Sequence, residues 1–149
     1  MAEYEFVTLD AVTLALTEAF MKQSEIPTRI LGMFDIVYGW LRQSGIQKTG
    51  HNYALYDQFS AHGMRMRVGF PVAQQFLGTT QVHCVELLGG KAAHTMHRGS
   101  YSGLPTAHSK LRDWCTQRSL PLAGESWEIY GDWTDDESQL TTDIYIRLG

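Results

Sequence analysis

The chain has 149 residues, of which 44% are hydrophobic and 19% are charged, so its composition fits one folded domain rather than a disordered segment. The formal net charge of −4 argues against a nucleic-acid-binding surface, which is normally basic. No apolar run is long enough to span a membrane, and the first residues are acidic, so we expect a cytoplasmic protein without a targeting peptide.

The first half of the chain predicts two strands, a helix and two further strands. The helix is expected over residues 27–44, because Pro27 suits a first turn, Gly45 suits an end, and apolar residues such as Ile30 and Phe34 recur every three or four positions. The strands are short apolar runs bounded by turn residues, and they are expected near residues 5–9, 11–18, 53–58 and 64–72.

The second half predicts the same order of elements. Its helix is expected over residues 105–118, with Ser102 or Gly103 as the N-cap. We expect Leu104, Leu111 and Cys115 on its inward face, and Cys84 to be a buried hydrophobic residue as well. The strands are expected near residues 82–88, 92–97, 127–132 and 142–148, with a turn at Gly89-Gly90 between the first two.

A shift of 74 positions places several residues of one half on identical residues of the other. The matches are Trp40 with Trp114, Gln43 with Gln117, Gly50 with Gly124, and Tyr56 with Tyr130. They predict one domain, 1–149, made of pseudo-repeats about 1–74 and 75–149. Two ββαββ units side by side would share a larger sheet and bury both helices on one face. The expected fold is therefore α+β: duplicated ββαββ units with pseudo-two-fold symmetry, one antiparallel sheet, helices on one face and a central groove.

The segment Trp127-Glu128-Ile129-Tyr130 places a carboxylate among large apolar residues. Alternation along a strand puts Glu128 and Tyr130 on one face, and the equivalent strand of the first half would present Ala54 and Tyr56 beside them. A small Ala54 opposite Glu128 would leave room for a ligand on the carboxylate. The alternative is that Glu128 points into water from a half-exposed strand.

Other residue sets give weaker predictions. The histidines His94 and His97, weighed with His83 or His108, are poor joint metal ligands because the first two would face opposite sides of a strand, so no metal site is predicted. No nucleophile–base–acid set stands out, although a Tyr–Glu pair could carry out general acid–base chemistry. Trp40 and Trp114 fit either a helix core or the lining of a pocket.

Several runs together resemble a known family. They comprise 97–104 (HRGSYSGL), Leu111, Trp114, 121–124 (PLAG), 127–130 (WEIY), 142–146 (TDIYI) and 67–72 (RVGFPV). In order and spacing they resemble the GyrI-like small-molecule-binding family, which comprises the effector-binding domains of multidrug-responsive transcription regulators and their stand-alone relatives. The resemblance spans nearly the whole chain.

The resemblance implies a groove that binds lipophilic, preferentially cationic compounds. The family's central acidic residue matches Glu128, and its pocket tyrosines match Tyr56, Tyr130 and Tyr145; Tyr101, within the resembling run, is a further candidate. We expect no cofactor, no direct DNA binding and no membrane partner, and a monomer or homodimer. Because the two units occupy the chain from about Glu5 onward, a stand-alone binder is the leading hypothesis. The alternatives are a small hydrolase of strained electrophilic natural products, with Glu128 and Tyr56 catalytic, and a gyrase-modulating interaction protein.

Overall fold

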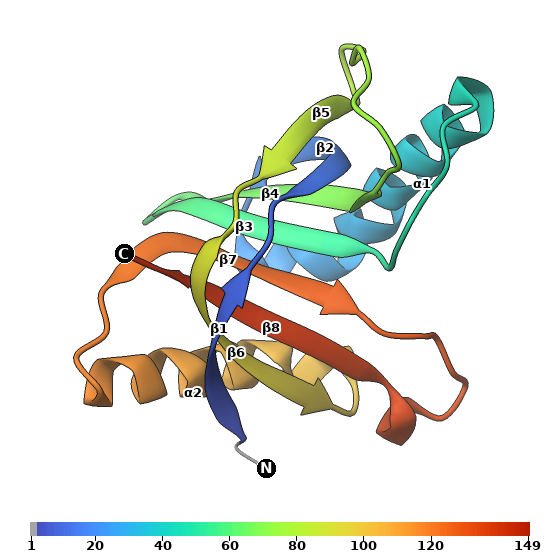
Figure 1. Ribbon diagram of the computed structural model, residues 1–149. Coiled ribbons are helices and arrows are strands. Elements are labelled where there is room, and N and C mark those ends of the chain that lie inside the picture. Colours follow the sequence, from blue (N-terminus) through green and yellow to red (C-terminus); the bar gives the residue numbers. More distant parts are fainter. Residues whose placement is uncertain (1–2) are drawn as a thin grey trace.

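The computed structural model describes residues 3–149, so the first two positions of the predicted domain 1–149 lie outside the described residues. The described chain forms strands and helices in the predicted order, which confirms the α+β class (Figure 1). In chain order the elements are β1 (Tyr4–Leu9), β2 (Val12–Met21), η1 (Gln23–Glu25), α1 (Ile26–Ser44), β3 (Tyr53–Ser60), β4 (Gly63–Pro71), β5 (His83–Leu87), β6 (Gly90–Arg98), η2 (Tyr101–Gly103), α2 (Leu104–Gln117), β7 (Leu122–Tyr130), η3 (Glu137–Gln139) and β8 (Thr141–Leu148).

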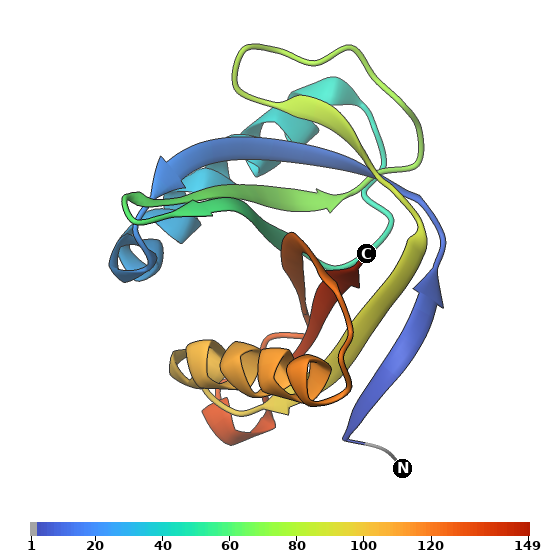
Figure 2. The same cartoon turned by 90° about the vertical axis from the view of Figure 1, so that its left-hand side faces the viewer.

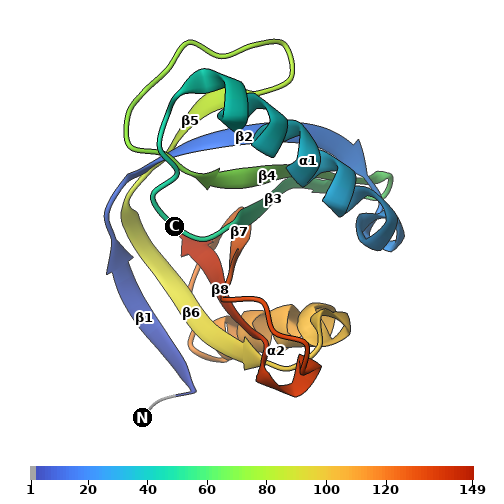
Figure 3. The same ribbon diagram turned by 90° about the vertical axis from the view of Figure 1, so that its right-hand side faces the viewer.

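All the strands belong to one antiparallel sheet with the order β1-β6-β8-β7-β3-β4-β2-β5. The segment β1–β2 pairs with the segment β5–β6 in a single continuing register, with Leu9 opposite Gly90 and Val12 opposite Leu87. Because each of these two segments supplies strands near both ends of the order, the sheet has to curl. Figures 2 and 3 show this curl, with β1 and β6 turned away from the layer formed by β2 and β4.

The two helices cover the same face of the curled sheet. Val37 of α1 packs against Phe70 of β4, and Leu111 of α2 packs against Ile144 of β8. Pro27 lies in the first turn of α1, and Gly45 ends this helix in the left-handed conformation with φ of 72°. Both features agree with the sequence prediction, as does the placement of both helices on one face.

The opposite face of the sheet carries a core cluster built from strands alone. Trp127 and Leu55 lie at its centre with 1% of their surface exposed. Its buried members come from both halves of the chain: Leu14, Leu16, Tyr53, Leu55, Leu87, Ala92 and Trp127. The two halves therefore share one core on this face, which we call the strand core.

The pseudo-two-fold axis passes through the centre of the sheet. Strands β3 and β7 pair with Ala54 directly opposite Glu128, and these two residues are related by the 74-residue shift. The helices begin 78 positions apart, at Ile26 and Leu104 (104 − 26), but end 73 positions apart, at Ser44 and Gln117 (117 − 44), because α1 has 19 residues against 14 in α2. The fully buried residues Val37 of α1 and Leu111 of α2 are 74 positions apart (111 − 37), so the shift of 74 relates inward positions of the two helices as well as the central strands.

Candidate ligand-binding site

Glu128 lies at the centre of the sheet on the face that carries the helices. It alternates along β7 with Trp127, which enters the strand core on the other side. Only 3% of the residue is exposed to solvent. A carboxylate this buried is stable only if its oxygens are hydrogen-bonded or paired. The structure therefore excludes the alternative in which Glu128 points into water.

Both carboxylate oxygens of Glu128 accept hydrogen bonds from buried or partly buried side chains. The hydroxyls of Tyr56 and Tyr130 donate to Oε1 at 2.9 and 2.6 Å, and Nε2 of His108 lies 2.7 Å from Oε2. These partners come from β3, β7 and α2. Within residues 3–149, no lysine or arginine forms an ion pair with Glu128. The carboxylate is thus held by two phenols and an imidazole.

Burial changes the acid–base behaviour of the two tyrosines. It raises the pKa of Tyr56 well above its ordinary value, and the negative charge of Glu128 and the hydrogen bond to it raise the pKa further. Burial, followed by the charge of Glu128, likewise raises the pKa of Tyr130 well above its ordinary value. Both phenols consequently stay protonated at neutral pH and act as hydrogen-bond donors.

Aromatic rings from both helical regions surround this carboxylate. Phe34 of α1 and Tyr101 of η2 meet Tyr130 edge-on, with ring centroids 6.3 and 5.5 Å apart. Tyr56 meets the ring of His108 in the same manner, at 6.1 Å. We call the set Glu128, Tyr56, Tyr130, His108, Tyr101 and Phe34 the Glu128 cluster. It combines one acidic group with rings that can contact apolar or cationic ligands.

Three residues predicted for the site lie elsewhere. Tyr145 is on the opposite face, where its ring stacks on Trp127 at 5.5 Å, because it alternates along β8 with the helix-facing Ile144. Trp114 packs on Phe6 of β1 at 5.0 Å, away from the cluster. Trp40 packs on Phe76 at 4.4 Å beside the second half of α1. The two tryptophans thus pack each helix against a neighbouring segment and do not line the Glu128 cluster.

Other residues named from the sequence lie close to Glu128 in the structure. Tyr56, Tyr130 and Tyr101 belong to the Glu128 cluster, and Ala54 is fully buried opposite Glu128. His108 and Phe34 were not among the predicted ligand-binding residues. His108 continues the inward stripe of α2 that includes Leu104, Leu111 and Cys115, so its helix position was the available signal.

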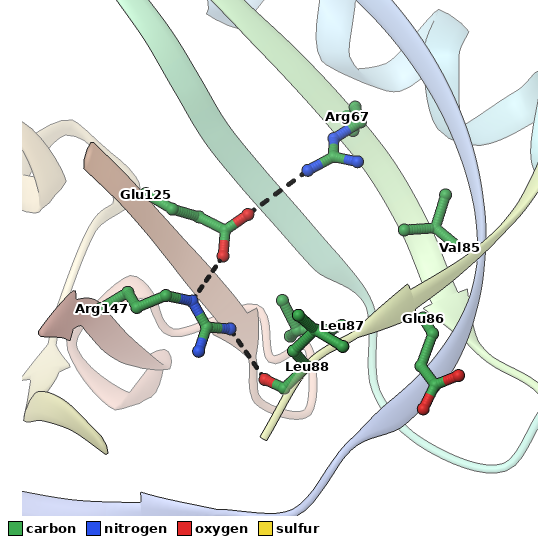
Figure 4. A pocket seen from close by; sticks show the side chains of 7 residues that line it. All are labelled: Arg67, Val85, Glu86, Leu87, Leu88, Glu125 and Arg147. Carbon is green, nitrogen blue, oxygen red and sulfur yellow. Dashed lines mark hydrogen bonds and ion pairs between the residues drawn. The ribbon is translucent and has the colours of Figure 1, made fainter. Parts of the chain in front are cut away.

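A separate cavity of about 160 Å³ lies on the far side of the sheet. In Figure 4 the Glu125 carboxylate lies between the guanidinium groups of Arg67 and Arg147, at 3.4 Å from Arg67 and 2.9 Å from Arg147. Arg147 also donates to the carbonyl of Leu88 at 2.8 Å. Two guanidinium groups thus share the Glu125 carboxylate, and the side chain of Glu86 also lines the cavity. Among residues 3–149, no group of three or more His, Cys, Asp or Glu side chains is arranged to hold a metal ion.

The fold and the Glu128 cluster define a class of protein: a small α+β module in which two helices flank a buried acid at the centre of one curled sheet. The model of the GyrI-like small molecule binding domain matches residues 2–148, so the chain belongs to this family. No curated protein matches the chain. Among residues 3–149 there is no helix with the length and hydropathy needed to cross a membrane.

Solved structures share this fold at low sequence identity. The C-terminal domain of EcmrR is 15% identical with a TM-score of 0.87, covering 98% of this chain and 96% of that one. SAV2435, solved with tetraphenylphosphonium bound, is 13% identical with a TM-score of 0.71, covering 99% and 94%. A hydrolase from Listeria innocua is 9% identical with a TM-score of 0.65, covering 99% and 92%.

Proposed function

We propose that the protein binds amphipathic, preferentially cationic small molecules at the Glu128 cluster, with Glu128 as the charge partner of the ligand. The observation that carries the proposal is the 3% exposed carboxylate, bonded to two phenols and an imidazole rather than paired with a lysine or arginine. A buried acid without a permanent cationic partner favours a ligand that supplies one.

The energetics of a lipophilic cation fit these surroundings. Burying its apolar surface contributes about 25 cal/mol per Å². Each aromatic face that it contacts adds about 0.5–2 kcal/mol through cation–π attraction. The tetraphenylphosphonium bound to SAV2435 is a ligand of this chemistry in a protein of the same fold. It supports the proposed class of ligand.

Ligand entry requires side chains of the cluster to move, because both oxygens of Glu128 are already bonded. We expect Tyr101 and Phe34 to separate over Tyr130. Tyr101 is 40% exposed. It lies two residues after Gly99, whose φ of 124° is a conformation suited to glycine. Aromatic side chains that move in this way can adapt to ligands of different shape.

A titration with a cation and a neutral compound tests the proposal. Tetraphenylphosphonium and triphenylphosphine oxide share phenyl groups and differ in charge. In Glu128→Gln the amide can still accept from both tyrosines, so the fold is preserved while the charge is lost. We expect cation affinity to fall at least about tenfold and neutral affinity to change little. Glu86→Gln, at an exposed position of β5, is the matched control. An unchanged cation affinity in folded Glu128→Gln would refute the proposal.

A second candidate function is hydrolysis of electrophilic compounds. The specific observation in its favour is that one carboxylate contacts two phenols and an imidazole, which together could accept and return a proton. In this case Glu128 would activate water, and Tyr56 would donate a proton. Incubation with activated esters and epoxides, followed by mass spectrometry, separates the two functions. Hydrolysis that disappears in Glu128→Gln and Tyr56→Phe would favour the enzyme.

A further inference from the structure

His108 reaches Glu128 from a different side than the tyrosines. Its Nε2 lies 2.7 Å from Oε2, whereas Tyr56 and Tyr130 share Oε1. The side chains of His108 and Glu128 are only 11% and 4% exposed. A ligand that brings a charge to Glu128 therefore meets the imidazole at short range, with little water to screen the two.

We propose that His108 sets the charge preference of the site: an imidazolium leaves the His108–Glu128 pair neutral and favours uncharged amphipathic ligands, whereas a neutral imidazole leaves one negative charge and favours cations. This inference rests on the proposed function of the Glu128 cluster and adds its regulation by pH.

The groups around His108 are one carboxylate and uncharged aromatic rings. From β7 it meets Glu128, which also accepts from Tyr130, and from β3 it meets Tyr56; burial raises the pKa of both tyrosines, so they stay neutral. From α1 the cluster receives the uncharged ring of Phe34. On its own helix, the guanidinium of Arg112 donates to Ser109 at 3.1 Å. Imidazole is the side chain whose charge ordinarily changes between about pH 5 and 8.

Because His108 and Glu128 are in contact, a proton on His108 and a cationic ligand at Glu128 weaken each other's binding. A cation against Glu128 lies beside the imidazole, so protonation of His108 adds a like charge that opposes binding. By linkage, binding of the cation must then release a proton wherever the imidazole carries one before binding. A neutral ligand exerts no such effect.

Two substitutions separate the hydrogen bond of His108 from its charge. His108→Gln retains an N–H donor that does not titrate, and His108→Phe retains a ring against Tyr56 without a donor. The affinities of tetraphenylphosphonium and triphenylphosphine oxide would be measured by calorimetry from pH 5.5 to pH 8. For the wild type we expect the cation-to-neutral affinity ratio to rise about tenfold across this range. In both variants the cation-to-neutral affinity ratio should not change with pH.

A measurement without substitutions completes the test. Calorimetry in buffers of different ionisation enthalpy should detect proton release when the wild type binds the cation, and none when it binds the neutral compound. If the wild type binds the cation through Glu128 with a constant ratio and no proton release, the inference is overturned. A His108→Gln variant with the wild-type slope also overturns it, since another group then titrates. If the wild type binds neither compound, or if cation affinity survives Glu128→Gln, the proposed function itself fails.

Discussion

The hydrogen bonds of Glu128 determine which chemistry its carboxylate can offer. Neutral phenols stabilise the carboxylate without cancelling its charge, whereas a buried arginine would cancel it. Tyr130 also contacts Phe34 and Tyr101, so it connects the acid to both helical regions. In the proposed function, a ligand contacts the same residues that hold the carboxylate.

At the scale of single residues, Tyr56→Phe tests whether the Glu128 cluster stabilises the fold. The substitution removes one donor to a buried carboxylate, and we expect the free energy of unfolding to fall by about 1–2 kcal/mol. Urea denaturation measures the change. Tyr145→Phe is the matched control, because its ring stacks on Trp127 on the opposite face, and we expect a change of less than about 0.5 kcal/mol. Equal losses in the two variants would contradict the special role of Tyr56.

At the scale of elements, the side chain of His94 connects strand β1 to the neighbouring strands. It lies at one end of the strand order, and His94 of β6 reaches Glu5 of β1 through Nδ1 at 2.9 Å and Asp143 of β8 through Nε2 at 2.8 Å. Two carboxylates on the two ring nitrogens favour the doubly protonated imidazole. The hydrogen bond that His94 donates to Asp143, followed by the one that it donates to Glu5, raises the pKa of His94 above its ordinary value despite partial burial.

A raised pKa for His94 predicts a definite pH dependence of stability. Because the folded pKa lies above the unfolded one, the stabilisation is complete below about pH 6.5 and is lost as the pH rises through the folded value. We expect the difference in unfolding free energy between wild type and His94→Gln to be larger at pH 6 than at pH 9. Urea denaturation at the two pH values measures it. A difference that grows with pH would show the assigned direction to be wrong.

At the scale of the whole molecule, the curled sheet joins the two halves. The strand core draws Leu14 and Leu55 from the first half and Leu87 and Trp127 from the second, and Tyr145 packs against it. Neither half can therefore bury its strands without the other. The Glu128 cluster lies across the same central strands from this core, so the position of the acid depends on the association of both halves.

This shared core predicts cooperative unfolding. Trp127→Phe keeps an aromatic ring beside Tyr145 but loses volume, and we expect it to destabilise the protein by about 1–2 kcal/mol without splitting the transition. Trp40 and Trp114 report on opposite halves, so fluorescence and far-ultraviolet circular dichroism should give coincident urea curves. Two separate transitions would contradict a single core.

Much of this architecture could be predicted from hydrophobic spacing, because alternation and helical periodicity are local properties of the sequence. The same alternation placed Glu128, Tyr130 and Tyr56 on one face. Tyr145 could not be placed by matching alone, since its face depends on the register of β8 against β7. The contact of His108 with Glu128 depends on how α2 is positioned over the sheet, which periodicity does not determine. Trp40 and Trp114 likewise pack on segments distant in sequence.

The proposed function depends on Glu128 as the charge partner of a bound cation. Calorimetric titration of tetraphenylphosphonium into wild type and Glu128→Gln, with triphenylphosphine oxide as the neutral reference, tests it most directly. We expect the substitution to lower cation affinity at least about tenfold and to change neutral affinity and the circular dichroism spectrum little. Equal cation affinity in the two folded proteins would contradict it.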